Sequence, residues 1–157
     1  MKAKARFLGH PIHQMLVVFP LGLLGTSVVF DVIHHVGGSP EMALVAYWTM
    51  AAGLIGGVVA APFGLADWLA IPRGTRAKTV GALHGTGNVL VLMLFLASWM
   101  ARREMPTEPE LVATAAAVGG FAVAGMTAWL GGELVDRLGI GVDEGAHPNA
   151  PSSLRQP

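Results

Sequence analysis

Four long apolar stretches dominate this sequence, and they lie at residues 15–30, 43–66, 80–100 and 111–130. An α-helix needs about 20 predominantly apolar residues to cross the hydrocarbon core of a bilayer. Only 13% of the residues are charged, whereas an ordinary soluble domain has roughly 25%. We therefore expect an all-α integral membrane four-helix bundle, with spanning helices at about residues 12–33, 43–69, 80–101 and 111–134.

Glycine and proline residues separate the apolar stretches and divide the chain. They interrupt it at residues 37–40, 72–74 and 106–109, as such residues do between helices. Residues 143–157 contain three prolines, polar side chains and no apolar period, which is typical of a disordered segment. The sequence thus predicts one membrane domain at residues 1–142 and a flexible tail at residues 143–157.

The positive charges are distributed unevenly between the two sides of the expected bundle. Two of the ten Lys and Arg residues, Arg102 and Arg103, lie in the loop between the third and fourth helices. The other eight lie on the side of the chain termini. Cytoplasmic loops of membrane proteins have the excess of Lys and Arg. We therefore expect both termini and the tail in the cytoplasm, and the chain in a bacterial-type inner membrane.

Two histidines are expected at a similar depth near the cytoplasmic boundary. His13 lies in the first turn of the first helix, because Pro11 suits the first helical position. His84 lies near the start of the third helix, beside Gly81 and Gly85, which leave room for a flat group against the backbone. One histidine from each of two facing helices is the geometry of bis-imidazole haem ligation. The sequence thus predicts a b-type haem with His13 and His84 as the iron ligands.

Other polar residues are expected around these two histidines. Asn88 follows His84 by four residues and so lies on the same helix face. His10 and Asp67 fall at the same level of the bundle. We expect these three residues to contact the cofactor or to orient its ligands. Positive side chains just outside the boundary could pair with haem propionates, namely Arg73, Arg76 and Lys78.

Carboxylates at the same level leave other kinds of site open. Asp67, Glu133 and Asp136 could join the histidines in a nitrogen and oxygen site for non-haem iron, zinc or manganese. They could instead orient the ligating imidazoles without touching the metal. Without any cofactor, the same side chains would form hydrogen bonds between helices.

A second polar group lies at the opposite end of the first helix, at Asp31, His34 and His35. The helix rises about 31 Å between His13 and His34, so the two groups face opposite surfaces. A second haem here would need a methionine such as Met42 as its other ligand, because no further histidine is expected at this level.

Four elements of the sequence together resemble a known family: HPIHQMLVVFP at residues 10–20, GLADW at 64–68, His84-x-x-x-Asn88, and GGELV at 131–135. That family is DUF2231, whose members are small four-helix membrane proteins, and the resemblance covers about residues 7–142. Related forms joined to Rieske iron–sulfur domains imply a role near electron transfer. Many relatives have Tyr-x-His-Gly where this chain has Asp136-Arg137-Leu138-Gly139, so a ligand role of that histidine does not transfer to Leu138.

Three functions remain open. The first is a membrane electron-transfer protein or subunit that binds b-type haem. The second is a non-catalytic structural or assembly subunit of a larger respiratory or photosynthetic membrane complex. The third is a small metal- or quinone-binding membrane protein. The expected partners are the lipid bilayer and either other membrane proteins of such a complex or further copies of this chain.

Other classes of function find little support in the sequence. The chain has no cysteine, so it supplies neither a thiolate ligand nor an iron–sulfur cluster. It shows no Ser-His-Asp spacing, no phosphate-binding loop and no basic surface for nucleic acid. We therefore expect an electron carrier or accessory subunit rather than a stand-alone enzyme.

Overall fold

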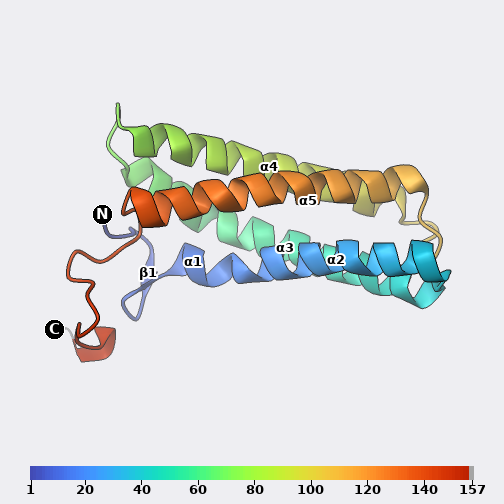
Figure 1. Ribbon diagram of the computed structural model, residues 1–157, viewed down its shortest axis with the longest axis horizontal. Coiled ribbons are helices and arrows are strands. Elements are labelled where there is room, and N and C mark those ends of the chain that lie inside the picture. Colours follow the sequence, from blue (N-terminus) through green and yellow to red (C-terminus); the bar gives the residue numbers. More distant parts are fainter. Residues whose placement is uncertain (156–157) are drawn as a thin grey trace.

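Four long helices lie side by side along the molecule, and the two chain termini lie at the same end (Figure 1). This computed structural model describes residues 1–155. A short strand pair, β1 (Arg6–Phe7) and β2 (His10–Pro11), precedes the helices. The first span consists of α1 (Ile12–Leu16) and α2 (Val18–Gly37). The remaining elements are α3 (Pro40–Ala70), α4 (Arg76–Ala101), α5 (Leu111–Gly132), the π-helix η1 (Glu133–Arg137) and the short 3-10 helix η2 (Ser153–Arg155).

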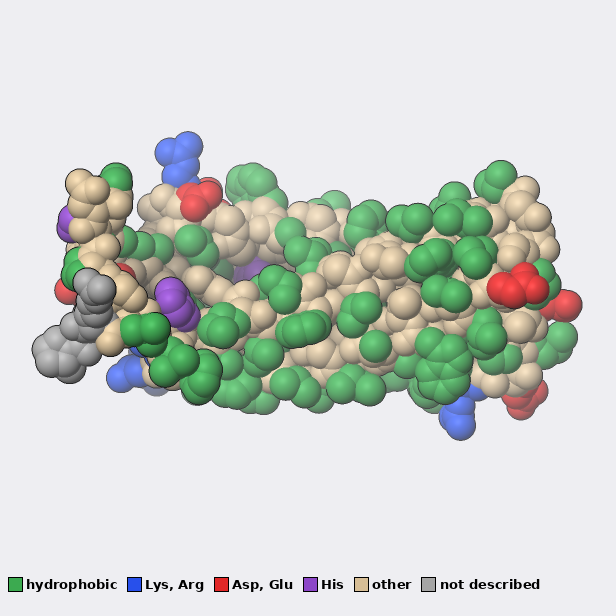
Figure 2. Space-filling model, turned by 90° about the horizontal axis from the view of Figure 1, so that it is seen from below, with side chains coloured by type: hydrophobic (Ala, Val, Ile, Leu, Met, Phe, Trp, Pro, Cys, Tyr) green, Lys and Arg blue, Asp and Glu red, His purple; other side chains and the backbone are tan. Residues whose placement is uncertain are grey.

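The helices are long and apolar enough to cross a membrane. The four spans contain 26, 31, 26 and 27 residues, and only 22% to 33% of the most apolar part of each is buried inside the bundle. Figure 2 shows a mainly hydrophobic middle surface, with the charged side chains gathered toward the two ends. An apolar outer surface of this size requires lipid around it. The sequence-based expectation of a multi-pass membrane four-helix bundle is therefore confirmed.

The interior contains a compact apolar core at mid-length of the bundle. Its buried members come from all four spans. Glycines let the helices approach one another closely around this core. A Cβ atom at Gly53 would lie 2.7 Å from the Leu24 side chain, and one at Gly120 would lie 2.9 Å from Phe95. Small residues let membrane helices pack closely. We call this cluster the apolar core; it consists of Leu24, Val28, Met50, Val91, Phe95 and Ala117.

The segment before the first span is a hairpin, which corrects the expectation that Pro11 is the first helical residue. Arg6 pairs with Pro11 and Phe7 pairs with His10 in an antiparallel register. Both turn residues, Leu8 and Gly9, have positive φ angles of 48° and 88°, as a two-residue hairpin turn of type I′ requires. Pro11 has extended backbone angles and precedes the first helical residue, so His10 lies in a strand.

The hairpin belongs to a segment that closes one end of the bundle, which we call the terminal face (residues 1–11, 71–75 and 138–155). The Met1 amino group donates a hydrogen bond to the Gly139 carbonyl at 2.8 Å, and Gly141 N–H donates to the Met1 carbonyl. Lys2 and Arg6 form ion pairs with Asp143 at 3.2 and 3.3 Å. The flexible tail was predicted to begin at residue 143. Gly139 and Gly141, before this boundary, and Asp143, at the boundary, all contact the N-terminal segment.

The other end, which we call the opposite face, contains a buried ion pair. Arg102 Nη1 lies 2.7 Å from Asp31 Oδ1, and both side chains are 0% exposed. Arg102 Nη2 donates to Ser98 Oγ, which donates to the Ala113 carbonyl. Arg102 follows the last residue of α4, as the sequence predicts, but its side chain is buried in the bundle, which the sequence did not indicate. The pair connects α2 to the end of α4 through the interior of the bundle.

We expect the replacement of only one member of this pair to leave an uncompensated buried charge. Arg102→Leu should lower the free energy of unfolding by about 3–5 kcal/mol. Asp31→Leu combined with Arg102→Leu removes both charges, and such apolar replacement is often neutral or stabilising, so the double variant should recover most of the loss. Circular dichroism during unfolding in mixed detergent micelles measures the difference. The exposed neighbour Arg103, changed to Leu, is the control, and an equal loss in the single and double variants would contradict the prediction.

The terminal face should loosen in acid. The Gly145 N–H and the Lys2 side chain stabilise the carboxylate and hold the pKa of Asp143 below its ordinary value. The ionised Asp143 carboxylate therefore stabilises its contact with Lys2 and Arg6 at any pH above the ordinary Asp pKa. This stabilisation is lost as pH falls through the lowered pKa of Asp143. Amide hydrogen exchange at residues 2–6, corrected for its intrinsic pH dependence, should accelerate on acidification. Asp143→Asn should abolish this pH dependence. If exchange in the wild-type protein is as independent of pH as in this variant, the prediction is contradicted.

Candidate functional site

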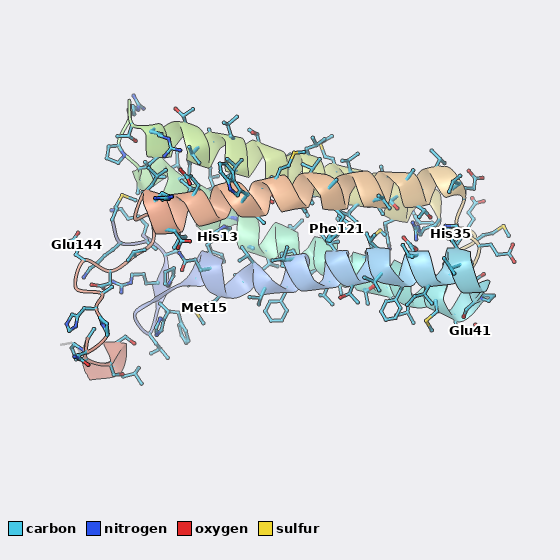
Figure 3. The ribbon with its side chains drawn as sticks, viewed as in Figure 1. His13, Met15, His35, Glu41, Phe121 and Glu144 are labelled. Atoms are coloured by element: carbon cyan, nitrogen blue, oxygen red, sulfur yellow. The ribbon has the colours of Figure 1, made fainter. Side chains whose placement is uncertain are left out.

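His13 joins the first span to α3 near the terminal face (Figure 3). Its Nδ1 lies 3.1 Å from the Ala60 carbonyl oxygen. The ring lies directly against Gly64, where a Cβ atom would be 2.7 Å from His13 Cε1. Helix α3 continues through Pro62, which lacks the N–H of an ordinary residue. The glycine and proline thus shape the part of α3 that receives the His13 ring.

His84 makes the corresponding connection between α4 and α5. Its Nδ1 lies 2.9 Å from the Thr127 carbonyl oxygen. Its ring faces Gly131, where a Cβ atom would lie 3.2 Å from His84 Cε1. Asn88 Nδ2 lies 3.2 Å from His84 Nε2, and Thr127 Oγ1 donates to Asn88 Oδ1 at 3.0 Å. Each predicted iron ligand therefore bonds to a backbone carbonyl of a neighbouring helix through Nδ1.

This hydrogen bonding fixes the state of both imidazoles. A carbonyl oxygen only accepts hydrogen bonds, so Nδ1 must bear the proton in His13 and in His84. In a neutral ring the lone pair then lies on Nε2, which is the nitrogen left for a metal or another donor. We call His13, His84, Asn88 and Thr127 the histidine site.

The carboxylates expected at this level have separate partners. Asp67 Oδ1 accepts hydrogen bonds from the backbone N–H groups of Lys4 at 2.6 Å and Ala5 at 3.3 Å. Glu133 forms an ion pair with Arg76 at 2.6 Å. Asp136 is exposed. Within residues 1–155, no three His, Asp or Glu side chains are grouped closely enough to hold a metal ion together.

His10 and the expected propionate partners also lie outside the histidine site as it stands. His10 is exposed, and its Nε2 lies 3.3 Å from Ser153 Oγ. Lys78 Nζ donates to the Trp68 carbonyl at 2.7 Å and lies 4.0 Å from the centre of the Trp68 ring. Arg73 is exposed. Lys78 and Arg76, which were expected to pair with haem propionates, therefore already bond to other residues of this protein.

The polar residues at the opposite face form their own contacts. His34 Nδ1 donates to the Ser39 carbonyl at 2.8 Å, and His35 Nε2 lies 2.9 Å from Thr114 Oγ1. Figure 3 shows His35 and Glu41 at the end away from His13. Asp31, which the sequence groups with these histidines, instead pairs with Arg102. Sequence reasoning missed the roles of Arg102 and Thr127, although a polar side chain within the apolar stretch of the fourth span was a possible signal for Thr127.

The histidine site can be tested for its fit to haem. Its donor chemistry fits, because both rings present Nε2 while Nδ1 is held by a backbone carbonyl. Such second bonds orient ligating imidazoles and increase their basicity. The space at His84 is taken, because the Asn88 amide donates to Nε2. The donor chemistry therefore suits iron ligation, and at His84 it requires that the Asn88 side chain rotate away from Nε2.

Gly64 should be required for the placement of the His13 ring. A Cβ atom here would overlap the imidazole, and overpacking of this kind costs about 1–3 kcal/mol. Gly85 is the matched control, because a Cβ atom there would meet nothing within 4 Å. Both Ala variants gain about 1 kcal/mol of helix propensity, so Gly64→Ala should be less stable than Gly85→Ala by about 1–3 kcal/mol. Detergent unfolding measures the difference, and equal stability would show that the His13 ring does not depend on Gly64.

Comparison with known proteins identifies the family of this chain. The family model described as a predicted membrane protein, DUF2231, matches residues 9–144. No curated protein and no solved structure matches the chain. The matched range contains all four spans and both histidines of the histidine site. The chain therefore belongs to the DUF2231 family of membrane proteins.

Proposed function

We propose that this protein is a membrane electron-transfer protein, or a subunit with that role, which binds a b-type haem through His13 and His84. The observation that supports the proposal is the shared hydrogen bonding of the two rings. In both, Nδ1 donates to a backbone carbonyl of another helix, so Nε2 has the free lone pair that an iron ligand needs. Two imidazoles from different helices are a known way to hold haem in a helical bundle.

The residues of this chain would have distinct roles at such a site. His13 and His84 would hold the group through Nε2, and a bound haem would supply reversible one-electron chemistry. The Ala60 and Thr127 carbonyls would hold the rings in the required tautomer. Asn88 would leave His84 Nε2 and remain available as a hydrogen-bond donor. Asp67 would act indirectly, by fixing the N-terminal segment over this end of the bundle.

A structural or assembly subunit of a larger energy-converting complex is the second candidate. The observation in its favour is that every side chain of the histidine site already has a partner within the protein. Hydrogen bonds between membrane helices stabilise a bundle without any cofactor. In this role the protein would be colourless and would co-purify with other membrane proteins or with copies of itself.

The positive charges support a particular orientation for either role. With Arg102 buried, only Arg103 remains as an exposed positive side chain at the opposite face. The excess of Lys and Arg at the terminal face is thus greater than the sequence count indicates. We therefore propose that the terminal face lies in the cytoplasm, in an inner membrane of the bacterial type. A redox partner of His13 and His84 would approach from that side.

A reduced-minus-oxidised absorbance spectrum separates the two candidates. Protein purified in detergent from cells with ample haem should show a Soret band and an α band. Both bands should be lost in His13→Ala and in His84→Ala, because each variant removes one axial nitrogen. His147→Ala is the matched control, since His147 lies in the segment after the last membrane span and its replacement should leave the spectrum unchanged.

Two results would decide against haem ligation by His13 and His84. A colourless wild-type protein would reject it and favour the structural role, which cross-linking and size measurements of detergent extracts would then test. A haem spectrum that survives both histidine changes would place the cofactor elsewhere in the molecule. Circular dichroism of each variant shows whether the helices are retained, so a loss of colour is separated from a loss of fold.

A further inference from the structure

Thr127 is connected to His84 in two ways, through its backbone and through its side chain. Its carbonyl oxygen accepts the hydrogen bond from His84 Nδ1 at 2.9 Å. Its hydroxyl donates to Asn88 Oδ1 at 3.0 Å, and the Asn88 amide nitrogen lies 3.2 Å from His84 Nε2. Because Nδ1 bears the ring proton, Nε2 accepts from this amide. One residue of α5 thus fixes both nitrogens of the imidazole, directly at Nδ1 and through Asn88 at Nε2.

The Thr127 hydroxyl has one proton and two acceptors within reach. The Ala124 carbonyl oxygen, in the preceding turn of α5, lies 3.0 Å from Oγ1, which is also the distance to Asn88 Oδ1. Threonine in a helix commonly donates to a carbonyl of the preceding turn. The single proton therefore either holds the Asn88 amide or bonds to the carbonyl of its own helix. In the second state, Asn88 Oδ1 loses the bond to α5.

Packing fixes the Thr127 side chain and leaves its hydroxyl proton free to move. Thr127 is only 4% exposed. Its methyl group lies against Gly87 on α4, where a Cβ atom would be 2.5 Å from Thr127 Cγ2. A β-branched side chain in a helix has few rotamers, so Oγ1 stays between its two acceptors. Asn88 is half-buried, and its amide can turn once Oδ1 is released.

We propose that Thr127 is a positioning residue that controls access to His84 Nε2 through Asn88. When the hydroxyl proton is on Asn88 Oδ1, the amide covers Nε2 and the lone pair is occupied. When the proton is on the Ala124 carbonyl, the amide turns away and Nε2 is open to a ligand that takes its lone pair. The identity of this ligand as haem iron rests on the proposed function, whereas the same control applies to any reagent that needs the lone pair.

The rate at which diethyl pyrocarbonate acylates His84 tests this control without any cofactor. The reagent attacks an imidazole nitrogen through its lone pair, and peptide mass spectrometry of the haem-free full chain in detergent gives the rate at each histidine. Thr127→Val keeps the methyl contact with Gly87 and removes the hydroxyl. It should raise the rate at His84 about fivefold, which corresponds to one neutral hydrogen bond of about 1 kcal/mol. Thr127→Ser keeps the hydroxyl and should restore the wild-type rate.

Asn88→Ala shows whether Thr127 acts through the amide. This variant removes the group that covers Nε2, so the rate at His84 should rise by about fivefold or more. Adding Thr127→Val should then raise the rate no further, whereas independent effects would combine and overturn the proposal. Thr86→Val is the matched control, because the Thr86 hydroxyl bonds to carbonyls of its own helix and its loss should leave the rate unchanged.

Three other results would overturn the proposal. One is an unchanged rate at His84 in Thr127→Val, and another is a rate in Thr127→Ser as high as in Thr127→Val. The third is an equal rise at His13, which would show a general loosening of the bundle rather than release of His84 Nε2. The absorbance spectrum tests haem separately, so a colourless protein whose His84 rate depends on the Thr127 hydroxyl would reject haem and retain the control of Nε2.

Discussion

The absence of water in the bilayer core determines how this protein uses its polar residues. A polar group inside lipid has to find its partner within the protein. Here the partners come from other helices: His13 bonds to α3, His84 and Ser98 bond to α5, and Asp31 pairs with Arg102 at the end of α4. Each polar side chain is therefore also a cross-link that fixes the position of one helix relative to another. The four apolar spans provide a general tendency to enter the membrane, and these few bonds specify their arrangement.

The polar residues are divided between two centres with the apolar core between them. The histidine site lies toward the terminal face, and Asp31 and Arg102 lie near the ends of α2 and α4 at the opposite face. The apolar core between them contains side chains such as Met50 and Phe95, and the buried Ser27 at that level bonds to the Leu24 carbonyl of its own helix. A redox role at the histidine site would be served most directly by a partner at the terminal face.

Much of this arrangement could be predicted from the sequence, because hydrophobic length is a local property. The four spans follow from it, and so do the positions of His13 and His84 at one end. The partners of individual side chains could not be predicted in the same way. The bonds to Ala60 and Thr127 involve backbone carbonyls, which have no sequence signature. The burial of the Arg102 side chain could not be predicted, because a count of charges in loops contains no information on where each side chain points. The contact of Asp67 with Lys4 depends on an N-terminal segment that folds back over the bundle.

The two candidate roles of the histidine site differ at one atom. The Nδ1 bonds to Ala60 and Thr127 stabilise the bundle and would orient iron ligands equally well. Only Nε2 distinguishes the roles, because a structural histidine needs nothing there and a ligand needs an accessible lone pair. At His84 this lone pair accepts from the Asn88 amide, which Thr127 Oγ1 holds in place. Asn88 is thus a weak and replaceable donor at the position that iron would take, since a coordinate bond to a metal exceeds a neutral hydrogen bond of about 1 kcal/mol. The competition between Asn88 and a metal for His84 Nε2 therefore determines which role the site has.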